Sequence, residues 1–157
     1  MILENEILRL LPADPALAPR AAAYYIRNRA FLRPFEPERP PAFFTPEAQR
    51  GILLREMLDA QSGRAYCFYI EPKCAPALLI GGIGLNNVVW GAFCSAFLGY
   101  KLDAAYTGQG YMTEAVRLVA EYAFTQLGLH RIEANVMPRN TASLRVVEKN
   151  GFASEGL

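Results

Sequence analysis

The chain has 157 residues, of which 52% are apolar and 20% are charged, and its formal net charge is +1. We expect one domain, residues 1–157, because domains cluster near this length and a chain of this size buries a core without disulfides. The composition excludes disordered, collagen-like and disulfide-rich proteins, and the balanced charge gives no sign of nucleic acid or an anionic membrane as a partner.

The first third of the chain predicts a strand, a helix and a loop. Residues 2–11 alternate loosely between apolar and polar side chains, which indicates a strand. Pro19 is typical of a first helical turn, so a helix is predicted over 21–29. Five prolines between residues 31 and 46 forbid a regular ladder there, and the same stretch carries four phenylalanines. We therefore expect an extended loop that packs over the core, lines a binding cleft, or does both.

The middle of the chain predicts a second helix and three strands. Residues 45–47, Thr-Pro-Glu, form a typical helix start, and the predicted helix runs to residue 60. Strands are predicted over 64–70, 77–89 and 94–102, and the short connections between them favour an antiparallel meander. Three glycines in the second of these strands indicate a bulge or a close approach of two backbones.

The last third has the clearest pattern. Apolar residues recur with helical spacing over 111–127, and the glycine that follows suits a left-handed helix cap. A strand is predicted over 131–137, where a proline ends it. Asn140 then caps a short helix that ends near residue 150, and residue 152 begins another strand. This order of elements indicates an α/β (α+β) fold with a mixed central sheet flanked by helices.

The cysteines and the histidine form no recognisable site. Cys67, Cys74 and Cys94 are scattered without a CxxC pair, so we expect reduced thiols in a cytoplasmic protein, with no disulfide and no metal. The single histidine, His130, has no neighbours at ligand spacing. The longest apolar stretch, 77–85, is far short of the ~20 residues that a membrane helix needs, and the N-terminus lacks the basic region of a signal peptide.

Residues 105–113, AYTGQGYMT, carry the most informative motif. Gly108 and Gly110 stand immediately before the long predicted helix, where they let the backbone bend and approach a ligand. The first amides of that helix have no internal partner and lie at the positive end of its dipole, so they suit an anion such as a pyrophosphate. A tight turn with glycine caps explains the same spacing equally well. The absence of a following Lys disfavours nucleotide hydrolysis.

Two stretches together resemble a known family. YTGQGYMTEA at 106–115, followed by RIEANVMPRNTASLRVVEKNGF at 131–152, resembles the acetyl-CoA-binding half of the GNAT N-acetyltransferases. It is most similar to the Rim-like branch, which acetylates the N-terminal amines of ribosomal proteins. The resemblance is strong over 98–157 and weaker near the start, at 8–10 and 31–35. It implies the GNAT fold, with a mixed sheet between helices.

The resemblance implies acetyl-CoA as co-substrate. Ala105 stands where the family motif has Gln or Arg, so one side-chain contact is missing and backbone amides must hold the phosphates. Asn140 resembles the asparagine that contacts the pantetheine arm, although it also suits a helix cap, and one side chain can serve both roles. Lys101, Arg145 and Lys149 are the open alternatives for the 3′-phosphate. The residues implied for cofactor binding are Tyr100, Lys101, Leu102, Gly108, Gln109, Gly110, Tyr111, Met112, Thr113 and Asn140.

Acetyl transfer needs an amine that has lost its proton. An α-amine has a pKa of about 7.7–8.0 and lysine about 10.4, so at pH 7 roughly a tenth of an α-amine is already free base. An enzyme for α-amines therefore needs only a modest base. Glu133 is the candidate, and strand alternation places it on one face with Asn135. The alternative roles for Glu133 are those of a rim, ion-pair or substrate-positioning residue. Asn135 stands where some Rim-type enzymes have a catalytic glutamate.

The departing thiolate needs a proton donor. Many GNAT enzymes use a tyrosine on the helix after the pantetheine asparagine, but residues 140–151 contain none. Ser143 is the candidate that the resemblance offers, and its alternative role is to satisfy backbone amides in the first helical turn. For the acceptor we predict contacts with Arg33, Phe35 and Asn135, with Glu36 as a further selector.

The sequence therefore indicates a cytoplasmic N-acetyltransferase, a monomer or a homodimer, that transfers acetyl directly from acetyl-CoA to a protein N-terminal α-amine in a ternary complex. The alternatives are acetylation of a small-molecule amine, such as an antibiotic or a polyamine, and a non-catalytic acyl-CoA-binding module. Chains of the family usually continue beyond the stretch that matches 151–152 with a further strand. We expect the sheet here to lack that final strand and to present an open edge.

Overall fold

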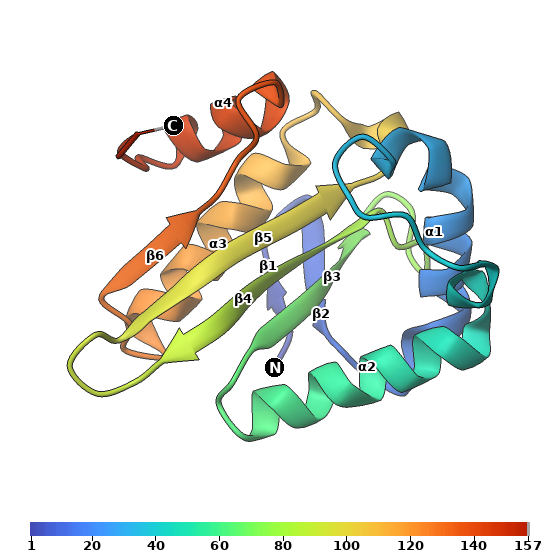
Figure 1. Cartoon of the computed structure of the whole chain (residues 1–157), viewed down its shortest axis with the longest axis horizontal. Helices are drawn as coiled ribbons and strands as arrows, with labels where there is room; N and C mark the ends of the chain where they lie inside the picture. The colour runs from blue at the N-terminus through green and yellow to red at the C-terminus, as the bar shows by residue number, and fades with distance from the viewer. Residues whose placement is uncertain (157) are drawn as a thin grey trace.

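The computed structural model describes residues 1–156 and contains one mixed, six-stranded sheet in the order β1-β2-β3-β4-β5-β6 (Figure 1). Neighbouring strands are antiparallel from β1 to β5, whereas β5 and β6 are parallel. The predicted α/β class with a mixed sheet and an antiparallel meander is confirmed. The strands are β1 (Leu3–Glu4), β2 (Leu8–Pro12), β3 (Tyr66–Pro72), β4 (Gly81–Val89), β5 (Ser95–Leu102) and β6 (Arg131–Ala134).

Helices cover both faces of this sheet. Alternate residues of β3 point to opposite sides: Phe68 and Ile70 pack with α3, whereas Tyr69 packs with α1 and α2. The α-helices are α1 (Ala18–Leu32), α2 (Pro46–Gln61), α3 (Tyr111–Thr125) and α4 (Thr141–Lys149), and the short 3-10 helices are η1 (Pro15–Leu17), η2 (Pro41–Phe44) and η3 (Ala104–Tyr106). Within residues 1–156, no helix has the length and apolarity needed to cross a membrane.

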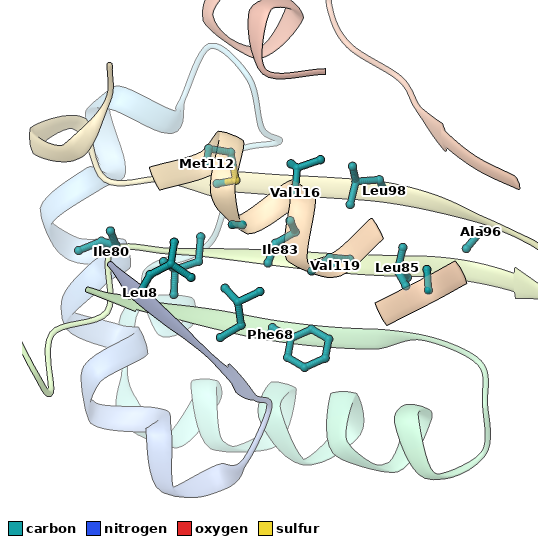
Figure 2. Close-up of a cluster of buried hydrophobic side chains, with 14 of the residues drawn as sticks. Leu8, Phe68, Ile80, Ile83, Leu85, Ala96, Leu98, Met112, Val116 and Val119 are labelled. Carbon is teal, nitrogen blue, oxygen red and sulfur yellow. The ribbon is translucent and has the colours of Figure 1, made fainter. Parts of the chain in front are cut away.

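The main core lies between α3 and the sheet. Figure 2 shows Met112, Val116 and Val119 of α3 lying over strand side chains that include Ile83 and Leu98. Each such side chain contributes about 1.5–3 kcal/mol when it is fully buried. The helical spacing of the apolar residues in 111–127 therefore identified the core-facing side of α3 correctly, although the helix ends at Thr125.

The predicted first strand, 2–11, is two strands joined by a turn. The Asn5 side chain accepts hydrogen bonds from the backbone N–H groups of Ile7 (3.0 Å) and Leu8 (3.1 Å), and this reverses the chain. Asparagine stabilises such turns because its short side chain mimics a backbone acceptor. Loose alternation concealed the turn, so the prediction of one continuous strand was wrong.

The first helix is longer than the predicted 21–29, because no proline interrupts the chain between Pro19 and Pro34. The predicted loop therefore begins only after Leu32, and it contains the 3-10 turn η2. The predicted start of the second helix is confirmed, since the Thr45 side chain accepts from the Ala48 N–H at 3.3 Å.

The glycines of β4 allow a close approach of two strands. A Cβ at Gly81 would collide with the carbonyl oxygen of Lys101 on β5, so only glycine fits there. The bulge lies elsewhere, since the register shifts between Asn86 and Val89. Of the two predicted explanations, close approach is therefore confirmed at Gly81.

The end of the chain departs from the prediction in two places. The strand predicted over 131–137 pairs with β5 only to Ala134. Residues 152–156 form no strand, and the Phe152 N–H instead donates to the Val147 carbonyl at 3.0 Å, which continues the turn that ends α4. The strand predicted from residue 152 is therefore absent among the residues that the structure describes.

Candidate active site

A cavity of about 470 Å³ opens where β5 and β6 separate. The two strands pair from Ser95–Arg131 as far as Leu98–Ala134 and then diverge, as Figure 1 shows. Residues 98–102 of β5, Ala134 at the end of β6 and residues 135–137 after it line the gap. The end of α1 with its following loop, the start of α3, and α4 supply the remaining walls.

The cavity is lined from both faces of the sheet. Tyr100 and Lys101 are neighbours on β5 and so point to opposite faces. The Tyr100 hydroxyl contacts Ser143 of α4, whereas the Lys101 ammonium lies 4.7 Å from the centre of the Tyr25 ring of α1. We call the part lined by Gly108, residues 110–113, Arg145 and Lys149 the α4 end, and the part lined by Phe31, Phe35, Glu36 and Lys101 the α1 end.

The start of α3 has the conformation that an anion site requires. Gly108 and Gly110 have φ angles of +74° and +87°, in the left-handed region that favours glycine. The first-turn amides at 111–113 have no partner within the helix and lie at its positive end. Five of the predicted residues of this loop, Gly108 and residues 110–113, line the cavity. The side chain of the sixth, Gln109, instead donates to the Ala105 carbonyl at 3.0 Å.

Positive side chains lie beside those amides. Arg145 and Lys149 are one turn apart on α4 and both line the α4 end. Neither has an ion pair with any residue in the described range 1–156. Lys101 faces the other way, with its ammonium 3.7 Å from the Glu36 carboxylate. Of the three cations that the sequence left open for a phosphate, two therefore lie at the amide end of the cavity.

Asn140 combines the two roles that the sequence left open for it. Its side-chain oxygen accepts from the Ser143 N–H at 3.2 Å, which caps α4, and the residue also lines the cavity. The helix cap is confirmed, and contact with a pantetheine arm stays a prediction.

A tyrosine hydroxyl, which sequence reasoning missed, reaches α4 from β5. The Tyr100 hydroxyl lies 2.6 Å from the Ser143 hydroxyl and donates to the Ser143 carbonyl at 3.1 Å. Burial raises the pKa of the Tyr100 phenol above its ordinary value, although its hydrogen bond with Ser143 opposes the shift. The phenol therefore stays protonated near neutral pH. Strand alternation was the available signal, because Tyr100 shares a face with Leu98 and Leu102.

Glu133 and Asn135 are not brought together at the cavity. Asn135 lines it, but Glu133 is absent from the lining and its carboxylate accepts a 2.7 Å hydrogen bond from Arg131. Arg131 also donates to Glu155 at 2.6 Å. Strand alternation does not apply across this pair, because β6 ends at Ala134. The ion pair is one of the alternatives left open for Glu133, and its role as a base stays a prediction.

The aromatic loop forms the α1 end. Phe31 and Phe35 line the cavity together with Glu36. Arg33 points elsewhere, since it pairs with the exposed Glu38 at 3.2 Å and lines a neighbouring cavity of only about 40 Å³. Both explanations for the loop hold, because it lines the cavity and also packs Phe43 against the buried Tyr25 at 4.7 Å between ring centres.

Known proteins resemble this chain over most of its length. A family model described as "Acetyltransferase (GNAT) domain" matches residues 7–153. The probable N-acetyltransferase YjcK of Bacillus subtilis is 40% identical over 156 residues, which cover 99% of this chain and 86% of that protein.

Two solved structures share its architecture. The ribosomal-protein-S5-alanine acetyltransferase of Vibrio fischeri has a TM-score of 0.93 and 34% identity, covering 99% of this chain and 85% of the other. RimJ of Mycobacterium smegmatis in complex with CoA-disulfide has a TM-score of 0.89 and 29% identity, covering 99% and 76%.

Proposed function

The chain belongs to the GNAT acetyltransferase family, and on this premise we propose that it transfers an acetyl group from acetyl-CoA to the N-terminal α-amine of a protein, within the ribosomal-protein class of acceptors. The fold and the N-acetyltransferase activity implied by the sequence are confirmed. The observation that carries the finer proposal is the cavity between β5 and β6, because it joins an anion-binding end to an aromatic end across the sheet.

The α4 end suits acetyl-CoA. The left-handed loop at Gly108 and Gly110 presents the amides of residues 111–113 to a pyrophosphate. Beyond Leu98, β5 pairs with β4 on one edge while β6 has left the other, so the backbone of residues 100–102 is available to a pantetheine arm in sheet fashion. The similar RimJ of Mycobacterium smegmatis forms a complex with CoA-disulfide, which supports this assignment.

The chemistry is direct attack. The neutral amine nitrogen attacks the thioester carbonyl carbon, the tetrahedral adduct expels the CoA thiolate, and the proton lost from nitrogen ends on sulfur. The paired hydroxyls of Tyr100 and Ser143 line the cavity; they give a proton to that sulfur and recover the one that the amine loses. A tyrosine phenol is protonated at neutral pH at its ordinary pKa of about 10, and burial raises the pKa of Tyr100 further. Glu133 as a base, a cytoplasmic location, and a monomeric or homodimeric state stay predictions.

An α-amine acceptor agrees with the ionisable groups of the cavity. The lining contains no histidine among the described residues, and Glu36 is its one carboxylate. At pH 7 roughly a tenth of the α-amine molecules are already neutral, and these can attack without a base. The similar Vibrio fischeri protein is a ribosomal-protein-S5-alanine acetyltransferase, which supports an acceptor of the ribosomal-protein class.

The test is mass spectrometry of peptides incubated with the chain and acetyl-CoA. Each peptide carries one free α-amine and one internal lysine, and a matched peptide has its N-terminus blocked. We expect one acetyl group on the α-amine and none on the blocked peptide. Acetylation of lysine alone, or of polyamines or aminoglycosides in preference to peptides, would contradict the proposal. Cofactor binding without any transfer would favour a binding module.

A further inference from the structure

Glu36 is the single acidic residue that lines the cavity within residues 1–156. The other charged lining residues are Lys101, Arg145 and Lys149, which are all cationic. The one acidic contact that the cavity offers a positively charged acceptor therefore lies at the α1 end, where the Lys101 ammonium is 3.7 Å from it.

The backbone holds Glu36 in place. The N–H groups of Phe35 and Glu36 both donate to the Leu32 carbonyl, at 2.9 and 3.0 Å, so the residue is fixed to the end of α1. From the opposite wall, Arg139 donates to the Pro34 carbonyl at 2.6 Å and joins the loop to the segment between β6 and α4. The backbone at Glu36 is therefore fixed to the end of α1, and the loop two residues before it is joined to the segment between β6 and α4.

The Glu36 carboxylate has unused acceptor capacity. Its oxygen lies 3.7 Å from the Lys101 ammonium, which is an ion pair but too long for a hydrogen bond. No hydrogen bond to this carboxylate occurs in the part of the chain that the structure describes, although an ionised carboxylate accepts several. Its side chain is 22% exposed, so an entering molecule can reach it.

Three other carboxylates, which do not line the cavity, are already engaged. Glu56 accepts from the Tyr69 hydroxyl at 2.7 Å, and Asp103 accepts from Arg27 at 2.9 Å. Glu133 is paired with Arg131. Of the acidic residues within 1–156, Glu36 is thus the one that lines the cavity and accepts no hydrogen bond; it also lines the neighbouring cavity of about 40 Å³.

We propose that Glu36 binds the ammonium group of the acceptor as it enters between Phe31 and Phe35, and that Lys101 positions the Glu36 carboxylate for this contact. The inference rests on the proposed function and deepens it, because it names the residue that selects cationic amines. Lys101 keeps the carboxylate at the α1 end and does not occupy its hydrogen-bonding positions.

The experiment measures steady-state acetylation of a peptide with a free N-terminal alanine by the wild type, Glu36→Gln, Glu36→Asp and Lys101→Met. Glu38→Gln is the matched control, because it removes the same charge two residues further along the chain. The Glu38 side chain is 76% exposed. Glu36→Gln is expected to raise the acceptor KM about 10–100-fold, as for loss of a charged hydrogen bond. Its Kd for acetyl-CoA should stay within about twofold, because the cofactor contacts lie at the α4 end.

Glu36→Asp should recover part of the affinity, and Lys101→Met should raise KM less than Glu36→Gln. An unchanged KM in Glu36→Gln would overturn the inference, and so would a lowered kcat at constant KM or a parallel loss of acetyl-CoA affinity. A wild type that binds acetyl-CoA and acetylates no amine would instead contradict the proposed function. Melting temperatures of all variants separate misfolding from these outcomes.

Discussion

The two ends of the cavity are built in different ways. The α4 end consists of backbone amides, a helix start and two cations on one helix, and its main parts lie within residues 108–149. The α1 end is made of side chains from α1, its loop and β5, which are about 65 residues apart in sequence. Under the proposed function, the difference teaches that the cofactor would be held by local geometry, whereas the acceptor would be selected by contacts that only the fold brings together.

The largest expected effect concerns the hydroxyl pair between the two ends. Tyr100→Phe and Ser143→Ala each remove one member of this 2.6 Å contact. We expect kcat to fall about 100-fold in each, the lower range for loss of a general acid, with an unchanged Kd for acetyl-CoA. Single-turnover acetyl transfer checks this.

Thr125→Ala is the control for that experiment, because it removes a hydroxyl whose partner is the Glu121 carbonyl in α3. If both Tyr100→Phe and Ser143→Ala keep wild-type kcat, the sulfur is protonated by another group and this part of the mechanism is wrong.

The next effect concerns the glycine that ends the loop before α3. Gly110→Ala forces a residue with a Cβ into φ +87°, which costs roughly 1–2 kcal/mol and displaces the first-turn amides. We expect acetyl-CoA affinity to fall about 10–30-fold by calorimetry, since these amides would hold the phosphates.

Gly91→Ala is the matched control. Gly91 has φ +79° and likewise no atom within 4 Å of an added Cβ, but it lies in the β4–β5 turn. It should lose similar stability and keep its affinity. Equal losses of affinity in both variants would show that the effect is general destabilisation.

A smaller effect is expected for the α4 cations. Arg145→Ala and Lys149→Ala should each weaken acetyl-CoA binding about 3–10-fold, because both side chains are exposed and screened by solvent. If the Arg145 and Lys149 side chains contact the 3′-phosphate, the same variants should bind dephospho-CoA as tightly as the wild type does. Arg50→Ala, on the exposed side of α2, serves as the control. A loss that is equal for both ligands would place these cations at the pyrophosphate.

The sequence predicted the α4 end better than the α1 end. Glycines before a helix and an asparagine cap are local signals, so Gly108, Gly110 and Asn140 were identified correctly as loop and cap residues. The direction of Gln109 was not predictable, because its bond to the Ala105 carbonyl depends on the turn that the backbone adopts.

Long-range contacts explain the misses. The bond between Tyr100 and Ser143 spans 43 residues, and the pair of Lys101 and Glu36 spans 65, so no local pattern contains either. Glu133 was proposed as the carboxylate on the strand before Asn140, and its role as a base stays a prediction; only the shared face with Asn135 fails, because β6 ends at Ala134. Where pairing stops, the period of two no longer assigns faces.

The smallest expected effect concerns the contact that joins α1 to the end of β5. Arg27 donates to Asp103 at 2.9 Å, and the Asp103 carboxylate also accepts from the Ala105 N–H. Burial raises the pKa of Asp103, but the Ala105 N–H and Arg27 lower it by more, so the pKa lies below its ordinary value.

The pKa of Asp103 is lower in the folded than in the unfolded state. Its ionised carboxylate therefore adds to the free energy of unfolding above the unfolded pKa of about 3.9, and this contribution is lost as pH falls through the lower folded pKa. We expect Asp103→Asn to cost about 1 kcal/mol at pH 7 and less in acid, since Arg27 is 39% exposed. Urea unfolding at several pH values measures this. A cost that is independent of pH would contradict the assigned cause.

The most direct test of the two-ended cavity is calorimetric titration of acetyl-CoA into the wild type, Gly110→Ala and Glu36→Gln. We expect saturable binding at one site in the wild type, binding weakened about 10–30-fold in Gly110→Ala, and unchanged binding in Glu36→Gln. Equal affinity in Gly110→Ala and the wild type, or equal losses in the two variants, would contradict the separation of cofactor and acceptor ends. Absence of binding by a folded wild-type chain would contradict the cavity assignment as a whole.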